Sequence, residues 1–270
     1  MTDPKEQKIV VLTELKKSDN SLILNGIKIA TAFKKELCLV YNYRKKEKKN
    51  YSKLKQELKQ YLIPIRKEVP GLQISTLLLS ESWSTIPDIL ADEFEAIFLI
   101  ANSLKFKLYS KVLSESPVPM LFVRPESKIM DFNQIVQPID LRKENSDSSL
   151  WCSYFGRFNN AEIVAIAAND KGKHEKRELA RNVELTKKLY RKFQIRHKIY
   201  KGNKSSFRNS FEALDMALAS ECNLLTILGS SAVTPLDLLI GLPERKIIQR
   251  AGNLPVLVIN PRKDNYILCD

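Results

Sequence analysis

The stretch IVVLTEL, residues 9–15, returns at mid-chain as IVQPIDL, residues 135–141. A second pair repeats in the same way, because PMLFVRP at 119–125 closes the first half and PVLVINP at 255–261 closes the second. The chain has 270 residues, enough for two domains of about 130 residues, a common domain size. We therefore expect two similar domains in tandem, at residues 1–127 and 128–270.

Hydropathy and cysteine usage indicate the compartment. The sequence has no apolar run of the roughly 18 to 20 residues that cross a bilayer, and its polar start lacks the apolar core of a signal peptide. The cysteines lie far apart and form no CxxC pair, which argues against a zinc site or a disulfide framework; they are Cys38, Cys152, Cys222 and Cys269. These features predict a cytoplasmic protein without a membrane span and with reduced thiols.

The formal charge of +13 makes nucleic acid a candidate partner, since lysine and arginine supply phosphate contacts. The densest basic run, residues 44–49, falls between an apolar segment and an amphipathic one, where a solvated loop is the usual structure. No recognition module such as a zinc finger accompanies it. Nucleic-acid binding is therefore not favoured, and acidic proteins or anionic lipid remain open as partners of a basic surface.

Strand and helix patterns alternate through both halves, which predicts parallel sheets covered by helices on both faces. Residues 97–101 and 224–228 are continuously apolar, as strands buried on both faces are. The expected strands of the first half are 9–12, 37–41, 74–79, 97–101 and 120–123. Those of the second half are 135–139, 163–168, 195–200, 224–228 and 256–259.

Apolar spacing predicts the helices between these strands. Residues 22–33 and 51–68 fit helices in the first half, although Pro64 should kink the second one or end it early. In the second half a helix is expected to follow the polar start at 145–149. Two further helices are predicted with apolar faces turned inward: 178–193, through Leu179, Val183, Leu189, Tyr190 and Phe193, and 207–220, through Phe207, Phe211, Leu214 and Leu218.

The chain resembles the tandem form of the universal stress proteins. The resemblance rests on Val136–Asp140, which matches a first strand ending in Pro-x-Asp, and on residues 227–259. It implies two five-stranded, Rossmann-like α/β domains of the adenine-nucleotide alpha hydrolase-like type. Because members of the family dimerise through the last strand, it also implies that 120–123 pairs with 256–259 in an intramolecular pseudo-dimer. Pairing between chains, as a homodimer, is the alternative.

The resemblance also implies a nucleotide site in the second half, for ATP or AMP. In the family a Gly-x-x-Gly loop, nine residues and Gly-Ser or Gly-Thr cradle the phosphates. Here the matching residues are Gly229, Ser230, Ser231 and Gly241, while Ala232 replaces the second glycine, Gly241 comes one residue early and Leu242 follows it. Asp140 would bind the ribose hydroxyls and Ala168 would face the adenine.

Physical chemistry supports an anion site in this loop without reference to the family. Small residues let backbone amides approach a phosphate, and Thr234-Pro235 could begin a helix whose positive end faces it. The alternative is a strand-to-helix turn that needs small residues for purely structural reasons.

The first half departs further from this pattern. Leu12 and Glu14 occupy the Pro-x-Asp positions, and residues 102–108 contain no glycine. We therefore expect no ATP binding in the family's manner there, and a structural or partner-binding role instead.

Enzyme signatures are missing from the sequence. Neither His174 nor His197 belongs to a spaced metal-ligand set, and there is no nucleophile turn of the Gly-x-Ser-x-Gly type. The expected function is a non-enzymatic stress-response binding module with at most one degenerate nucleotide site and no metal. An ATP-regulated switch with weak ATPase activity near Asp140 and Gly229 is the alternative, and a basic nucleic-acid-binding protein is the third possibility.

Overall fold

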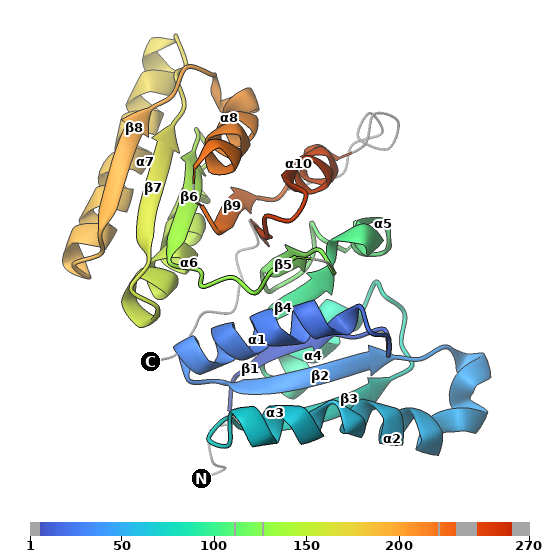
Figure 1. Ribbon diagram of the computed structural model, residues 1–270. Coiled ribbons are helices and arrows are strands. Elements are labelled where there is room, and N and C mark those ends of the chain that lie inside the picture. The colour runs from blue at the N-terminus through green and yellow to red at the C-terminus, as the bar shows by residue number, and fades with distance from the viewer. Residues whose placement is uncertain (1–5, 111, 126, 221, 231–241, 261–270) are drawn as a thin grey trace. The chain divides into compact units, whose positions relative to one another are not determined.

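The computed structural model describes residues 6–110, 112–125, 127–220, 222–230 and 242–260 (Figure 1). Their contacts divide into two compact units, residues 6–129 and 130–260. Each unit is an α/β structure with five parallel strands.

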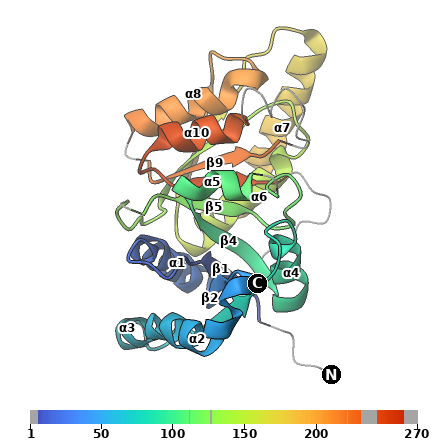
Figure 2. The same ribbon diagram turned by 90° about the vertical axis from the view of Figure 1, so that its right-hand side faces the viewer.

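The first unit contains strands β1 to β5. The strands are β1 (Lys8–Leu12), β2 (Glu36–Asn42), β3 (Ile74–Leu79), β4 (Ala96–Asn102) and β5 (Met120–Val123). The helices are α1 (Asp19–Phe33), η1 (Lys45–Asn50), α2 (Tyr51–Gln60), α3 (Leu62–Glu68), α4 (Ile86–Phe94), η2 (Ser103–Lys105) and α5 (Phe106–Tyr109). Figure 2 shows α1 and α4 on opposite sides of β1 and β2. The strand order is β3-β2-β1-β4-β5.

The second unit contains strands β6 to β10. The strands are β6 (Gln134–Ile139), β7 (Glu162–Ala167), β8 (His197–Lys201), β9 (Leu224–Leu228) and β10 (Val256–Ile259). The described helices are α6 (Asn145–Phe158), α7 (Lys173–Lys192), α8 (Ser206–Ala219) and α10 (Pro243–Ala251). Helix α6 packs on α7, while α8 packs on α10. The strand order is β8-β7-β6-β9-β10, so both units have their strands in the order third, second, first, fourth, fifth.

The predicted fold class is confirmed, and the ten strands lie within about two residues of their expected positions. Every residue of β4 and β9 is buried, as their continuous apolar sequences predicted. The helix predicted at 51–68 is broken at Tyr61 into α2 and α3, because Pro64 lacks the N–H that would continue the helical hydrogen bonds. The basic run predicted as a loop forms the short 3-10 helix η1, none of whose residues is buried. The predicted pairing of the two halves through their last strands, and the alternative homodimer, stay predictions.

Helix α1 packs closely against the sheet of the first unit at Gly26. Gly26 makes this possible, because a methyl group there would stand 2.6 Å from Cγ2 of Val11 and 3.2 Å from Cδ1 of Leu37. A side chain of any size at residue 26 would therefore have to push the helix or the strands apart.

The predicted inner faces of α7 and α8 are partly wrong. Phe207 is 88% exposed and Leu218 is 47% exposed, whereas α8 buries Asn209, Ala213, Leu214 and Ala217. The two alanines let the helix backbone approach the strands more closely than phenylalanine and leucine would. In α7 the fully buried residues are Asn182, Thr186 and Tyr190, so the inner line of that helix is mainly polar.

The polar face of α7 has partners in β6 and α6. The hydroxyl of Tyr190 donates a hydrogen bond to Oε1 of Gln137, whose Nε2 donates to Oγ of Ser149 at 2.9 Å. The hydroxyls of Ser149 and Thr186 are 2.8 Å apart. These four buried residues supply hydrogen-bond partners for one another, which removes most of the free-energy penalty for burying polar groups.

In the part of the chain that the structure describes, no helix is both long enough and apolar enough to cross a membrane.

Candidate functional site

A cavity of about 480 Å³ lies in the second unit, at the carboxyl ends of β6 and β9. These two neighbouring strands are parallel. From β6 the chain leads to β7 on one side of the pair, and from β9 it leads to β10 on the other side, so the strand order reverses between them. Parallel α/β sheets bind ligands at such a point. The polar lining comes from Asp140, Arg142, Ser206, Ser210, Ser230 and Glu244, and apolar lining from Leu141, Phe207, Phe211, Ile227, Pro243 and Ile247.

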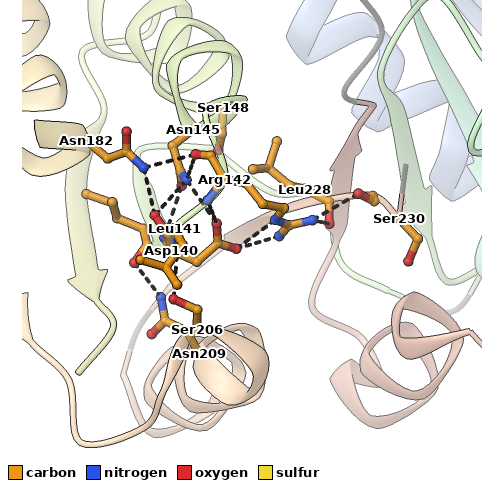
Figure 3. A network of polar contacts seen from close by, with 12 residues as sticks. Asp140, Leu141, Arg142, Asn145, Ser148, Asn182, Ser206, Asn209, Leu228 and Ser230 are labelled. Carbon is orange, nitrogen blue, oxygen red and sulfur yellow. Dashed lines mark hydrogen bonds and ion pairs between the residues drawn. The ribbon is translucent and has the colours of Figure 1, made fainter. Parts of the chain in front are cut away.

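Asp140 follows directly after β6 and is only 3% exposed. Its carboxylate forms an ion pair with Arg142, whose Nη2 and Nε donate to Oδ2 at 2.6 and 2.9 Å (Figure 3). The Arg142 backbone N–H and Nδ2 of Asn145 donate to Oδ1 at 2.8 and 3.0 Å. Both carboxylate oxygens therefore already accept two hydrogen bonds each from the chain itself.

Arg142 extends from Asp140 to the end of β9 (Figure 3). Its Nη1 donates to the carbonyl oxygens of Gly229 at 3.0 Å and Leu228 at 3.4 Å. The guanidinium thus lies between the aspartate predicted to bind ribose and the loop predicted to bind phosphate. A ribose hydroxyl could reach the carboxylate only by displacing part of this contact.

Two asparagines fix the loop that carries Asp140 and Arg142. Asn145, in the first turn of α6, accepts from the Asp140 N–H at 3.2 Å and donates to the Asp140 carbonyl at 3.0 Å. Asn182 of α7 donates to the carbonyls of Asp140 and Arg142 at 2.9 and 3.0 Å. Because both side chains are buried and both Nδ2 groups donate hydrogen bonds, the carboxylate and the guanidinium are held in place before any ligand arrives.

The Ser230 amide of the predicted phosphate loop is also occupied. The backbone N–H and the hydroxyl of Ser230 donate to Oε1 of Glu244, at 2.5 and 2.8 Å. Glu244 lies in the first turn of α10, where a carboxylate is favoured by the helix dipole, and it is 3% exposed. Its carboxylate takes the hydrogen bonds that a phosphate would otherwise receive from Ser230.

The structure brings two of the predicted site residues to the cavity, because Asp140 and Ser230 both line it. Gly229 packs against the end of β10, where an added methyl would meet Oδ1 of Asn260 at 2.9 Å. Ala168 is 1% exposed and donates its N–H to Ile139 at 2.9 Å, and it does not line the cavity. Ser231 and Gly241 lie outside the described residues, as do Ala232 and the helix start predicted at Thr234-Pro235.

Comparison with solved structures shows what this architecture is similar to. A universal stress protein from Archaeoglobus fulgidus DSM 4304 superposes with a TM-score of 0.67 over 96% of this chain and all of its own, at 11% sequence identity. The fold is that of universal stress proteins. The resemblance noted in the sequence is thereby confirmed at the level of the fold.

Two further structures share the universal-stress-protein fold with this chain. A candidate universal stress protein from Pseudomonas aeruginosa UCBPP-PA14 has a TM-score of 0.58 and 18% identity, covering 95% of this chain and 94% of that one. A protein of unknown function from Pseudomonas aeruginosa PAO1 has a TM-score of 0.57 and 17% identity, with 95% and 93% coverage. No protein-family model matches the sequence, and no curated protein matches it.

The first copy of the fold has its own cavity, of about 1050 Å³, at the carboxyl ends of its strands. Glu14, which takes the place of Asp140, accepts from Nδ2 of Asn102 at 2.9 Å and pairs with Lys16 at 3.4 Å. The Lys105 ammonium is 4.0 Å away. Burial raises the pKa of the Tyr109 phenol at this cavity, and the carboxylate of Glu14 raises it further. This cavity was not predicted from the sequence.

The two copies build the turn after their first strand in the same way. Asp19 accepts from the Glu14 N–H at 3.0 Å, just as Asn145 accepts from the Asp140 N–H. Burial raises the pKa of Asp19, although hydrogen bonds from the Lys16 and Glu14 backbone oppose that shift. The sequence contains the signal for this arrangement, because ELKKSD at 14–19 aligns with DLRKEN at 140–145. The repeat therefore runs past residues 15 and 141 and includes the cation that neutralises each carboxylate.

Other reactive side chains lie away from the two cavities. His174 is exposed, and Nδ1 of His197 is 2.7 Å from the Ile195 carbonyl oxygen. Cys38 and Cys152 are buried. Among the described residues no cluster of histidine, cysteine, aspartate and glutamate has the arrangement of a metal site.

Proposed function

We propose that the protein is a non-enzymatic, stress-response type of binding module that takes a small ligand into the cavity of its second unit. The proposal is carried by the position of that cavity, at the switch point between β6 and β9, with both Asp140 and Ser230 in its wall. Its volume of about 480 Å³ falls in the range of small-molecule sites. The universal-stress-protein fold supports the same assignment.

Nucleotides are one candidate ligand class, but two groups that would contact them are already engaged. Arg142 holds the Asp140 carboxylate, and Glu244 holds the Ser230 amide. ATP or AMP would have to displace both, and the Glu244 carboxylate would repel a phosphate. We therefore expect nucleotide binding by the second unit to be weak.

A cavity-filling variant tests the proposed site without assuming a ligand class. Ser210 lines the cavity from α8, so Ser210→Trp should block it. Leu218→Trp, on an exposed position of the same helix, is the matched control. Ligand-observed NMR with a mixture of aromatic fragments should show binding to the wild type and to Leu218→Trp and loss of binding in Ser210→Trp. Equal binding by all three proteins, or by none, would reject this cavity as the site.

An ATP-regulated switch with weak ATPase activity is the second candidate, because nucleotide entry would have to move both Arg142 and Glu244. Calorimetric titration of ATP and AMP, with and without magnesium, together with a phosphate-release assay, distinguishes it from the first. Tight ATP binding that disappears in Asp140→Ala would favour the switch. Weak binding without phosphate release would favour the binding module.

A further inference from the structure

The cavity of the second unit has one charged side chain that no other described residue neutralises. Among the residues that the structure describes, the charged side chains in its lining are Asp140, Arg142 and Glu244. Asp140 and Arg142 neutralise each other at 2.6 Å. Glu244 forms no ion pair with any residue in the described ranges. The described part of the lining therefore carries a net negative charge, which comes from the nearly buried Glu244 carboxylate.

One oxygen of the Glu244 carboxylate also has no hydrogen-bond partner among the described residues. Oε1 of Glu244 accepts from the N–H and the hydroxyl of Ser230, whereas Oε2 is buried and meets no donor within the described part of the chain. Buried polar atoms almost always have a partner, and an ionised carboxylate can only accept. A ligand in the adjoining cavity could donate the missing hydrogen bond to Oε2, and a positively charged donor would make the strongest one.

The rest of the cavity suits an apolar body. Phe207 and Phe211 contribute two aromatic rings from α8, and Ile227 and Ile247 contribute aliphatic surface from β9 and α10. Phe207 is 88% exposed, although large aromatic residues are usually covered in monomeric proteins. A ligand ring placed against this phenylalanine would remove part of its apolar surface from water.

We propose that the cavity binds an organic cation, in which an ammonium group on an aromatic or aliphatic body lies beside Glu244. This inference rests on the proposed function, because it specifies the ligand class of the same cavity. In this site Glu244 determines specificity: its carboxylate attracts the cation and, by holding the Ser230 amide, excludes a phosphate. The ligand therefore differs in the sign of its charge from a nucleotide.

Three indole compounds of nearly equal size test the sign of the preferred charge. Tryptamine carries an ammonium group, tryptophol a hydroxyl and indole-3-propionate a carboxylate on the same ring. Calorimetry on the full chain should give tryptamine an affinity about tenfold or more above that of indole-3-propionate, as expected for a charge-assisted hydrogen bond. Glu244→Gln keeps the size of the side chain and an acceptor for Ser230, and it should reduce this preference to about twofold or less.

A second variant separates the local role of Glu244 from a general loss of negative charge. Glu184→Gln removes one carboxylate from the exposed side of α7 and should leave the preference unchanged. Equal affinities for the three compounds, a preference for indole-3-propionate, or a tryptamine preference that survives in Glu244→Gln would each overturn the inference. In those cases the cavity would still be a binding site. If Ser210→Trp also changed nothing in the fragment experiment, the proposed function itself would be wrong.

Discussion

Replacing Arg142 with alanine should destabilise the second unit, because it leaves the Asp140 carboxylate buried with half of its partners. Oδ2 of Asp140 loses both of its donors, at 2.6 and 2.9 Å, while Oδ1 keeps Asn145 and a backbone N–H. Breaking a fully buried ion pair costs about 3–5 kcal/mol, whereas an exposed pair contributes about 0–1 kcal/mol. The Asp140 side chain is 5% exposed and that of Arg142 is 36% exposed, which places this pair between the two cases. We expect Arg142→Ala to lower the free energy of unfolding by about 2 kcal/mol.

Urea denaturation followed by circular dichroism measures this loss at neutral pH. Arg181→Ala is the control, because the Arg181 side chain is 65% exposed and stands 3.9 Å from Glu178 in a surface pair; its expected effect is below about 0.5 kcal/mol. A double-mutant cycle with Asp140→Asn should give a coupling energy of about 1–2 kcal/mol. A coupling energy near zero, with Arg142→Ala no less stable than the control, would refute the structural role given to this ion pair.

Two further predictions concern packing and thiol chemistry. Gly26→Ala should lower the unfolding free energy by about 1–3 kcal/mol, because its methyl would stand 2.6 Å from Val11, whereas Gly71→Ala, with nothing within 4 Å, should leave urea midpoints unchanged. Burial raises the pKa of Cys38 to about 11 and that of Cys152 to about 12 from an ordinary value of 9.0, so both thiols should resist Ellman's reagent at pH 8 until the protein unfolds. Because the folded state favours the protonated thiols, their contribution to stability should be complete below pH 9.0. It should disappear as the pH rises through 11 and 12. An unfolding free energy that does not change over this pH range would contradict their burial.

The positions of the strands were predictable because local sequence determines them. Buried parallel strands such as β4 and β9 form continuous apolar runs in the sequence. The internal duplication predicted that the two halves share one strand order, whatever that order is. Proline acts on its own helix, so the break between α2 and α3 could also be predicted from Pro64. These features depend on neighbours in the sequence.

The helix faces could not be predicted as reliably, since apolarity is only one route to burial. Periodicity placed Phe207 and Leu218 inward, but the buried face of α8 is made of Asn209, Ala213, Leu214 and Ala217. In α7 the buried line includes Thr186, because its partner Ser149 on α6 is itself a buried polar residue. Partners of this kind are identified only when two helices have been placed together.

The site shows the same division between local and distant information. Asp140 and Ser230 were found from a local motif, and Arg142 could have been found by following the internal repeat two residues further. Glu244 could not, because its contact with Ser230 joins residues 14 positions apart and depends on where α10 begins. Glu244, which most changes the expected ligand chemistry, is therefore a residue that no sequence motif indicated.

The distribution of tryptophan gives each unit its own spectroscopic reporter. The chain has only two tryptophans, Trp83 in the first unit and Trp151 in the second. Trp83 lines the larger cavity, and its ring centroid is 5.2 Å from that of Tyr109. Trp151 lies on α6 and is 1% exposed. A molecule that enters the larger cavity would change the emission of Trp83 and leave that of Trp151 unaltered. With either tryptophan replaced by phenylalanine, fluorescence would show which half of the protein a compound occupies, and whether the two halves melt together or separately.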